Sequence, residues 1–490
     1  MTRILLIAVM LWTLPVRASQ PDLVLKGHLT NSNHQTYIQV PFDVPQQTQR
    51  ITVKFDYSGK QERSVIDLGL TGPDGRLLGW SGGNKSEFTI SAVDATPSYI
   101  PTPIHAGRWH LLLGIPNLRK MSSSDYEAHI FFSKTLGASD EPDVISKPLK
   151  AQAGWYRGDF HAHTAHSDGS CNRWNSSEKV PCPVFVTALA AAKRGLDFMA
   201  ITDHNTLSHA HSVRELQPYF NPMLLLVGRE ITTFFGHANV FGTLADINFQ
   251  VVSQESDSNR LLQDVAAQKG LISINHPVRP SGELCMGCGW NNQTDWKKVQ
   301  AIEVVNGADV DTIFSGVPFW HSQLNAGHYI TGISGSDNHQ PDQEKPNYTG
   351  RVGQPSTVVF ASELSQNAII NAVRQGHAFI DITGSNDKLL EITAQSSGGE
   401  KAMMGDRLQA AKGTNIQLRI QVKNAAGSNV QLWKDGKKWS LDLDNHITRN
   451  DQTIETSWSF DGDAHWLRAD VQDQSGKTIM IGNPIYLHSK

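Results

Sequence analysis

The sequence of 490 residues contains few cysteines, no long basic run and no apolar run long enough to span a membrane. No run of Lys and Arg exceeds two residues, and the formal net charge is -4. Proteins that bind long nucleic acids cluster basic residues against the phosphates, so we expect no long nucleic-acid partner. The apolar stretch at residues 4–16 is shorter than the ~20 residues of a membrane helix, so we expect no membrane span in the mature chain.

The first residues have the pattern of a secretion signal. Arg3 precedes the apolar stretch ILLIAVMLWTLPV, and small residues stand at Val16 and Ala18. This pattern predicts a signal peptide over residues 1–19, cleaved near Ala18 or Ser19, with an uncleaved anchor as the alternative. We therefore expect the mature protein to be periplasmic or secreted.

The cysteines are Cys171, Cys182, Cys285 and Cys288. In an exported protein an even number of cysteines predicts disulfides, and four cysteines allow three connectivities. The CMGC segment at residues 285–288 could also be half of a zinc knuckle, so a small structural zinc site is the alternative.

Two patterns divide the chain into domains. Residues 20–148 and 386–490 contain short alternating runs, such as YIQVPF and IQLRIQV, which predict β-sandwich domains. Residues 149–385 repeat a helix, a glycine and a strand, with Gly195, Gly270, Gly327 and Gly376 at the expected left-handed helix ends. Apolar strands alternating with helices predict a parallel α/β sheet, and some seven strands favour a TIM-like barrel.

Polar side chains recur where the apolar strands of the middle domain end. His161 and His163 alternate in GDFHAH and therefore share one face of a strand. The carboxyl ends of parallel barrel strands form one rim, where active sites lie. The candidate ligands expected at this rim are His161, His163, Asp168, His204, Glu230, His237, His276, Asp337 and His339.

A single histidine at a strand end is usually a hydrogen-bonded structural residue, but a recurrence on several strands is not explained in that way. Neutral imidazoles and carboxylates that converge on one rim form the ligand set of Zn, Mn or Fe. Without bound cations, three converging carboxylates would repel one another. Because bound divalent metals ionise water near neutral pH, the pattern predicts a metal-dependent hydrolase.

The motifs FHAHTAHSDG, ITDHNT, GREIT, GHANVFG, NHP and SGSDNH together resemble the PHP (polymerase and histidinol phosphatase) superfamily of metallohydrolases over residues 155–385. The resemblance implies a distorted (β/α)7 barrel with two to three divalent metal ions. It implies one metal on His161, His163, Glu230 and Asp337, a second on Glu230, His237 and His276, and a third on Asp168, His204 and His339. The signal peptide and the two β-domains make the architecture similar to the carbaryl-hydrolase group.

Three further residues are candidates for catalytic roles. Asp203, beside His204, could orient a ligand imidazole or cap a turn. His166 lies in the ligand loop and could protonate a leaving group. Arg279 follows His276 by three residues and could bind an anionic substrate group or lie exposed in a loop.

The resemblance to the PHP superfamily implies hydrolysis of a small-molecule ester, with a phosphoester as the first candidate, and the number of metal ions that it implies suits phosphoryl oxygens. The alternative is a carbamate or carboxyl-ester hydrolase of carbaryl-hydrolase type. An apolar wall for an aromatic substrate, or else core packing, is expected of Trp174, the MGCGW segment at residues 286–290, Phe319 and Trp320. A less favoured interpretation is a glycan- or partner-binding surface protein, with sugar platforms at Trp80, Trp109, Trp433 and Trp439.

Overall fold

The computed structural model describes residues 20–83, 85–136, 147–251, 257–283, 285–343, 350–440 and 444–490. The predicted signal peptide lies outside these residues. The chain forms two compact units, one with the described residues up to 44 together with 51–88 and 108–132, and one with 45–50, 89–107 and 133–490. Within the described ranges, no helix combines the length and the apolar character needed to cross a membrane.

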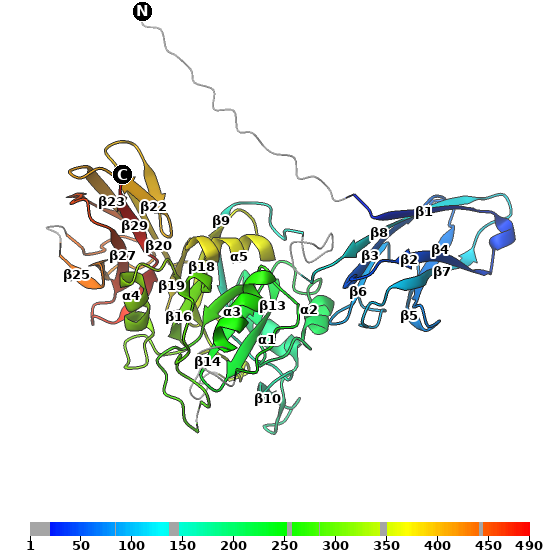
Figure 1. Cartoon of the computed structure of the whole chain (residues 1–490), viewed down its shortest axis with the longest axis horizontal. Helices are drawn as coiled ribbons and strands as arrows, with labels where there is room; N and C mark the ends of the chain where they lie inside the picture. The colour runs from blue at the N-terminus through cyan, green and yellow to red at the C-terminus, as the bar shows by residue number, and fades with distance from the viewer. Residues whose placement is uncertain are drawn as a thin grey trace, which may run out of the picture. The chain divides into compact units, whose positions relative to one another are not determined.

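The N-terminal strands form two four-stranded sheets (Figure 1). The first has the order β1 (Leu23–Leu29), β8 (Ser124–Ser133), β3 (Arg50–Tyr57) and β6 (Glu87–Ser91). The second has the order β2 (Tyr37–Val44), β7 (Gly107–Asn117), β4 (Val65–Thr71) and β5 (Leu77–Ser81). Burial alternates along β7 and places Trp109, Leu111 and Leu113 in the core, so Trp109 does not serve as a sugar platform.

The middle of the chain folds into a ring of strands. In order around the ring they are β9 (Gly154–Asp159), β12 (Phe198–Ile201), β13 (Leu224–Thr233), β14 (Gly236–Phe241), β15 (Leu271–Ile274), β16 (Ala301–Asn306) and β17 (Thr331–Gly335). The residues after β9 and β17 close the ring, because the His163 amide donates to the Asn338 carbonyl and the Asp337 amide donates to the His161 carbonyl.

This ring departs from the regular alternation predicted for a TIM-like barrel. Helices α1 (Val184–Lys193), α2 (Ala210–Leu216), α3 (Asp257–Ala267) and α4 (Val317–Asn325) occur between strands, but β14 runs antiparallel to both β13 and β15. No α-helix lies between β15 and β16 among the described residues. Because β13 and β14 form a hairpin, the start of β14 lies at the same rim as the end of β13.

Three of the four predicted glycine helix ends are confirmed. Gly195, Gly327 and Gly376 have φ angles of 72°, 84° and 77°, and Gly376 caps α5 (Gln366–Gln375). The prediction for Gly270 was wrong, because Lys269 adopts the left-handed conformation there with a φ of 55°. Gly270 is needed for packing instead, since an added Cβ would lie 2.9 Å from Cγ1 of Val265.

The C-terminal strands extend the sheet of the ring. β18 (Ser356–Ala361) pairs with β9, β19 (Ala378–Asp381) pairs with β18, and β28 (Thr478–Gly482) pairs with β19. The sheet continues through β27 (His465–Gln472), β24 (Asn429–Lys434) and β25 (Lys437–Trp439), while β29 (Ile485–Ser489) links β27 to β22 (Arg407–Ala410).

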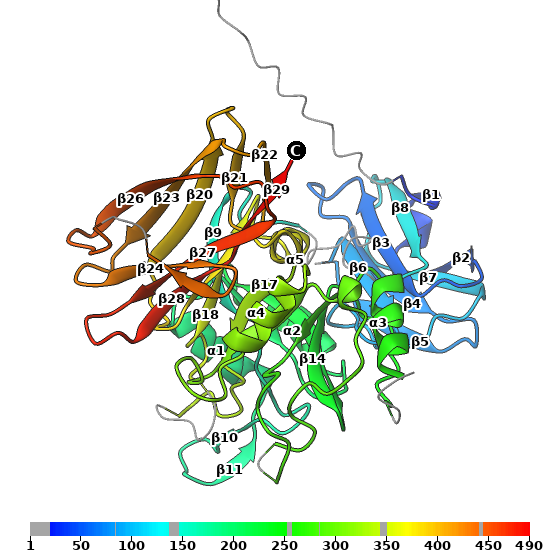
Figure 2. The ribbon, with the colours of Figure 1, turned by 60° about the vertical axis from the view of Figure 1, so that its left-hand side comes forward.

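A second C-terminal sheet contains β21 (Lys401–Met403), β20 (Leu389–Ser396), β23 (Asn415–Lys423) and β26 (Asp451–Ser459) (Figure 2). The two C-terminal sheets share a core that includes Leu390, Ile420 and Leu467. The residues after 386 are therefore β-structure that is hydrogen-bonded to the ring.

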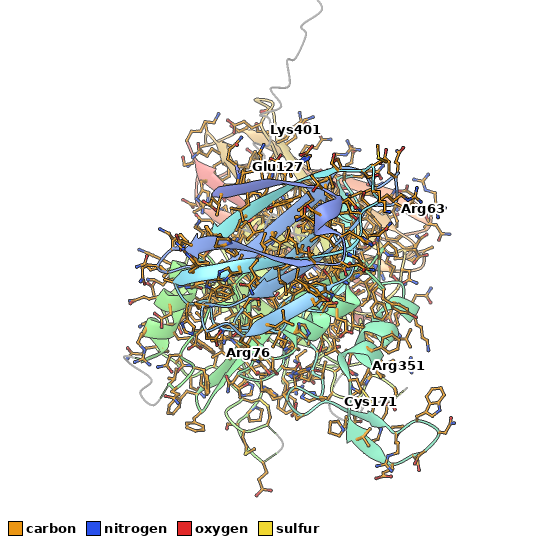
Figure 3. All side chains as sticks on the ribbon, turned by 90° about the vertical axis from the view of Figure 1, so that its right-hand side faces the viewer. Arg63, Arg76, Glu127, Cys171, Arg351 and Lys401 are labelled. Carbon is orange, nitrogen blue, oxygen red and sulfur yellow. A yellow bond between two sulfur atoms is a disulfide. The ribbon has the colours of Figure 1, made fainter. Side chains whose placement is uncertain are left out.

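All four cysteines are paired, which confirms the predicted disulfides. Cys171 and Cys182 close the hairpin of β10 (Ser170–Asn172) and β11 (Lys179–Pro181), where Cys171 is labelled in Figure 3. Cys285 and Cys288 form the second disulfide within the loop after β15. This pairing replaces the zinc-knuckle alternative.

Candidate metal centre

The nine predicted ligands lie on, or directly after, neighbouring strands of the ring. Glu230 lies within β13 and His237 lies at the start of β14. The others follow strand ends, with His161, His163 and Asp168 after β9, His204 after β12, His276 after β15, and Asp337 and His339 after β17. The structure brings all nine side chains together at the rim where the parallel strands end.

Glu230 is the common neighbour of the imidazoles, and its side chain is buried. Its Oε1 lies 3.3 Å from His161 Nε2, 3.3 Å from His237 Nδ1 and 3.4 Å from His276 Nε2. Its Oε2 lies 2.8 Å from His204 Nδ1 and 3.5 Å from His163 Nε2. A carboxylate whose two oxygens face separate imidazoles has the position of a ligand that bridges two cations.

The hydrogen bonds of His161 show that this region fits a cation. Its Nδ1 lies 2.9 Å from Oε1 of Glu303, and because a carboxylate oxygen accepts, Nδ1 carries the proton. Its Nε2 lies 3.3 Å from Oε1 of Glu230 and 3.3 Å from Oδ1 of Asp337, with no hydrogen-bond partner. Facing acceptors without water are unfavourable unless a proton or a metal ion lies between them.

His237 repeats this arrangement on the other side of Glu230. Its Nε2 donates to the carbonyl oxygen of Met286 at 3.1 Å, which leaves Nδ1 with a lone pair. That lone pair faces Oε1 of Glu230 at 3.3 Å. Two imidazoles, each fixed in one tautomer by an outer partner, therefore present lone pairs to one carboxylate.

The ligand atoms form three groups, each with atoms within 4.8 Å of one another. One contains His161, His163 and Asp337, another contains His163, Asp168, His204 and His339, and the last contains His237, His276 and Cys288. In the second group, Oδ1 of Asp168 lies 3.3 Å from His339 Nε2 and 3.7 Å from His204 Nε2. The nitrogen and oxygen donors of these groups suit Zn, Mn or Fe.

Two of the candidate ligands have backbone angles that are unusual for residues other than glycine. His276 has a φ of 28° and Asp337 has a φ of 52°. Such angles cost free energy, about 1–3 kcal/mol each, and persist where the surrounding structure fixes the side chain for a function. The His276 amide donates to Oε2 of Glu303 at 3.0 Å, which holds this turn in place.

The buried charges shift the pKa values of the centre in opposite directions. Burial opposes the charged form of His161, but Asp337 and Glu230 outweigh it and raise the pKa of His161 well above its usual value. Burial also opposes ionisation of Glu230, but His161 and His204 hold the pKa of Glu230 well below its usual value. Burial, with His339 and His204, lowers the pKa of His163 to about 4, so its imidazole is neutral at neutral pH.

A cavity of about 1030 Å³ opens onto these side chains. Asp168, His204, Glu230, His237, His276, Asp337 and His339 are among its lining residues. Arg279 also lines it, and its Nη2 lies 2.6 Å from Oδ2 of Asp309 while its Nη1 lies 4.0 Å from Oδ2 of Asp337. The structure therefore places Arg279 beside the candidate ligands rather than in an exposed loop.

Asp203 does not orient a ligand imidazole, so that predicted role was wrong. Its carboxylate accepts hydrogen bonds from the Thr164 amide at 2.7 Å and from the hydroxyls of Thr164 at 2.7 Å and Ser167 at 2.6 Å. Its imidazole neighbour is His209, at 3.3 Å, which is not one of the nine ligands. Asp203 instead anchors the loop that connects His163 to Asp168.

The catalytic role predicted for His166 stays a prediction, and the geometry of the site gives it no support. Its Nδ1 lies 2.7 Å from the hydroxyl of Ser208, and among the described residues it does not line the cavity. In the sequence His166 lies between the candidate ligands His163 and Asp168. The turn at residues 164–167 directs its side chain toward Ser208, just before α2. A tight turn therefore separates the side chain of His166 from those of the candidate ligands that are close to it in the sequence.

Of the predicted apolar wall, Met286 in the MGCGW segment lines the cavity, whereas the predicted Trp and Phe side chains do not. Trp320 and Trp290 are buried in the core, Phe319 packs against that core, and Trp174 is 88% exposed outside the cavity. The apolar side chains that line the cavity are those of Phe234, Phe249, Val251 and Met286. Phe234 and Met286 are 80% and 78% exposed, so they present apolar surface to a ligand.

Sequence reasoning missed Glu303, which lies in the apolar strand β16 and contacts His161 and the His276 amide. It also missed Asn275 and Asn306, whose amides donate to Glu230 at 2.9 Å and to Asp337 at 3.3 Å. The sequence did carry a signal for Glu303, which is the single carboxylate within the apolar run AIEVVNG. Such a group is rarely buried without a partner, so its position indicates a buried interaction.

No protein-family model matches the sequence, and no curated protein matches it. Among solved structures, the chain is similar to a two-domain protein from Bacteroides vulgatus described as containing a predicted PHP-like metal-dependent phosphoesterase. The two chains share 18% sequence identity, and the match covers 71% of this chain and 98% of that chain with a TM-score of 0.38. This is a distant likeness, so the function proposed below rests on the geometry of the site.

Proposed function

We propose that this protein is a metal-dependent hydrolase that cleaves a phosphoester bond of a small substrate. The observation that carries the proposal is the group of His161, Glu230 and Asp337, whose acceptor atoms face one another at 3.3 Å in a buried region. Divalent ions held there would supply Lewis acidity and a hydroxide nucleophile near neutral pH.

The outer partners of the ligands would keep the centre fixed during turnover. Glu303 holds the tautomer of His161, and the carbonyl of Met286 holds that of His237. The amides of Asn275 and Asn306 orient the two central carboxylates. Since these groups are in place before substrate binds, little reorganisation is needed for the reaction.

The cavity is consistent with a small anionic substrate. Its volume of about 1030 Å³ is that of a small-molecule site. Arg279 could pair with a phosphoryl oxygen, because guanidinium groups bind such oxygens through charge-assisted hydrogen bonds. Asp309 holds one nitrogen of this guanidinium and so fixes its orientation.

The apolar side of the cavity favours a second candidate, a carbamate or carboxyl-ester hydrolase. The exposed side chains of Phe234 and Met286 could contact an aromatic or alkyl group of a neutral ester. Arg279 is the single Lys or Arg among the described lining residues, and Asp309 already neutralises part of its charge. The two candidates share the same metal ligands and differ in which wall contacts the substrate.

A turnover assay with matched substrates tests the proposal. The metal-loaded protein is offered an aryl phosphate monoester, an aryl phosphate diester, an aryl N-methylcarbamate and a plain aryl ester. The His163→Ala variant serves as the blank, and His446→Ala, at an exposed position, serves as the control for the same substitution elsewhere. Metal content of each protein is measured in parallel by elemental analysis.

Dominant phosphate turnover, lost in His163→Ala and kept in His446→Ala, would support the first candidate. In that case Arg279→Gln should raise KM for the phosphate by about tenfold or more, because a charged hydrogen bond is worth about 1.5–3 kcal/mol. Dominant carbamate or ester turnover would select the second candidate. Retained turnover in His163→Ala, or no divalent metal after reconstitution, would overturn both.

Export is part of the proposal. The apolar stretch at residues 4–16 and the two disulfides support an oxidising compartment outside the cytoplasm. Expression with the native N-terminus should give a mature chain that begins near Ala18 or Ser19, as N-terminal sequencing would show. A full-length chain in the cytoplasmic fraction would contradict this.

A further inference from the structure

The loop at Cys285–Cys288 lies against the candidate metal centre, and the proposed reaction does not use it. Cys285 and Met286 line the cavity, while Cys288 is 1% exposed. The disulfide joins the two cysteines across Met286 and Gly287. Among the disulfides, only this one has a sulfur grouped with candidate ligand atoms in the described residues.

The backbone of this loop is shaped to fit the ligands from β14 and β15. The carbonyl of Met286 accepts from Nε2 of His237 at 3.1 Å. Gly287 has a φ of 79°, and a Cβ there would collide with the carbonyl oxygen of Thr233 and lie 3.3 Å from Nε2 of His237. The loop therefore approaches the Thr233 backbone, next to His237, more closely than a residue with a side chain at position 287 would permit.

Cys288 has the position of an additional ligand. Its Sγ and the ligand nitrogens of His237 and His276 all lie within 4.8 Å of one another. Glu230 Oε1 lies 3.3 Å and 3.4 Å from the nitrogens of the same two imidazoles. Glu230 is not itself a member of this group. Once the opened disulfide lets the Cys288 side chain turn toward Glu230, two imidazoles, one carboxylate and one sulfur would complete the four-coordinate set typical of zinc.

We propose that Cys288 is a redox-gated metal ligand, which binds the ion held by Glu230, His237 and His276 only when the Cys285–Cys288 disulfide is reduced. This inference rests on the proposed metal site. In the disulfide the sulfur carries no charge, whereas a free thiolate is a strong ligand for zinc-like metals. Oxidised protein thus keeps a coordination position open for substrate or water, and reduced protein fills it.

The redox step balances with a dithiol as the reductant. The dithiol supplies two electrons and two protons, the bond between Cys285 and Cys288 breaks, and the dithiol becomes a cyclic disulfide. The Cys288 thiol then loses its proton to solvent when it binds the metal. Cys285 lines the cavity and is the sulfur that a reductant reaches, because Cys288 is buried.

Reduction of the Cys285–Cys288 disulfide has opposite consequences for metal affinity and for catalysis. Four protein ligands make a closed site of the structural kind, whereas catalytic sites keep one position open. Reduction should therefore tighten metal binding and lower turnover. An exogenous disulfide, by oxidising the two thiols, should reverse both effects.

Cobalt titration of a matched pair of variants tests the inference. Cys285→Ser leaves Cys288 as a permanent free thiol, and Cys288→Ser removes the sulfur while it also removes the disulfide. We expect Cys285→Ser to show a sulfur-to-cobalt charge-transfer band without reductant, and to bind cobalt at least about tenfold more tightly than oxidised wild type. Cys288→Ser should show no such band with or without reductant.

Wild-type protein with and without dithiothreitol provides the same test without substitution. The band should appear on reduction, and it should still appear in Cys171→Ser/Cys182→Ser, which lacks the other disulfide. Cobalt binding with no sulfur band in reduced wild type or in Cys285→Ser would overturn the redox-gated ligand and leave the hydrolase proposal intact. Absence of cobalt binding in every form, oxidised wild type included, would overturn the proposed metal site itself.

Discussion

Two buried charged clusters in the larger unit differ in whether their charges are satisfied by the chain alone. The rim cluster contains His161, Glu230 and Asp337, and the interface cluster contains His321, Arg468 and Asp470 between α4 and β27. In the rim cluster, acceptor atoms face acceptor atoms. In the interface cluster, every described hydrogen bond joins a donor to an acceptor.

The interface cluster is complete without any added ion. Arg468 pairs with Asp470, and its Nε donates to Nε2 of His321 at 3.1 Å. The indole of Trp433 donates to Oδ2 of Asp470 at 2.7 Å, and the Arg468 guanidinium lies 5.2 Å from the Trp433 ring centre. Trp433 is thus committed to this cluster and is not a free sugar platform, contrary to the binding-protein interpretation.

The difference shows that burial of charge alone does not indicate a metal site. A buried pair that satisfies its own donors serves packing between elements, whereas buried acceptors that face one another require a proton or a metal ion between them. The same substitution, Asp to Asn, should therefore have different effects in the two clusters.

The largest effect is expected for Asp337→Asn at the rim. The amide keeps the shape of the side chain but removes the charge that a metal needs, so we expect turnover to fall by at least about 100-fold, beyond the range for loss of an outer partner. Metal content should fall as well. After chelation of the metal from both proteins, the variant and the wild type should unfold at similar temperatures. Wild-type turnover in this variant would refute the assignment of the rim cluster.

Asp470→Asn is the matched substitution in the interface cluster. It leaves the buried guanidinium of Arg468 without a countercharge, so we expect the free energy of unfolding to fall by about 3–5 kcal/mol. Metal content and KM of the folded fraction should remain as in wild type. A loss of bound metal with unchanged stability would mean that the two clusters are not functionally distinct.

A smaller effect is expected for Glu303→Gln, which alters an outer partner of the rim cluster. The amide can still accept from His161 Nδ1, but it carries no charge and cannot serve both His161 and the His276 amide equally. Metal affinity should fall by about 10–100-fold, as measured by competition with a chelating dye. An affinity within twofold of wild type would show that Glu303 has only a packing role.

The smallest effect concerns the pH dependence of the interface cluster. Burial, and then the charge of Arg468, lower the pKa of His321 to about 3 from its usual 6.5. As pH falls from 6.5 towards 3, the unfolded state takes up a proton at this residue and the folded state does not, so stability is lost on acidification. His321→Gln should reduce the slope of melting temperature against pH in this window.

His446→Gln, at an exposed position, is the control for that measurement because its environment changes little on folding. Equal slopes in His321→Gln and wild type would show that His321 does not contribute to the acid sensitivity of the fold. A reduced slope in His446→Gln would instead attribute the effect to histidine content in general.

The strand-end pattern was sufficient to locate the candidate ligands at one rim because it depends on a local rule. His161, His276 and Asp337 each follow an apolar run, and the carboxyl ends of parallel strands meet at one rim. His237 also lies at the predicted rim, but for a different reason, because it begins an antiparallel strand that a hairpin brings to the same rim. The pattern therefore located the residue without predicting the strand direction.

The roles of residues that are adjacent to the candidate ligands could not be predicted from the strand-end pattern. Asp203 lies beside a ligand in the sequence and yet anchors a loop, whereas Glu303 is distant from most ligands and contacts two of them. Similarly, Cys288 belongs to the CMGC segment that suggested a zinc knuckle, but it lies beside His237 and His276. These contacts are made across the closed ring, where sequence separation carries no information.

The sequence by itself determined the types of the candidate ligands, their placement at strand ends and the glycine ends of three helices, and it favoured disulfides without fixing which cysteines pair. Only the tertiary structure decided which acceptors face one another, which imidazole tautomers are fixed, and which side chains form the apolar wall. The physical reason is that strand periodicity and turn chemistry act over a few residues, whereas the ring brings together His161, Glu230 and Asp337 from three separate segments. The need for a cation arises from that convergence.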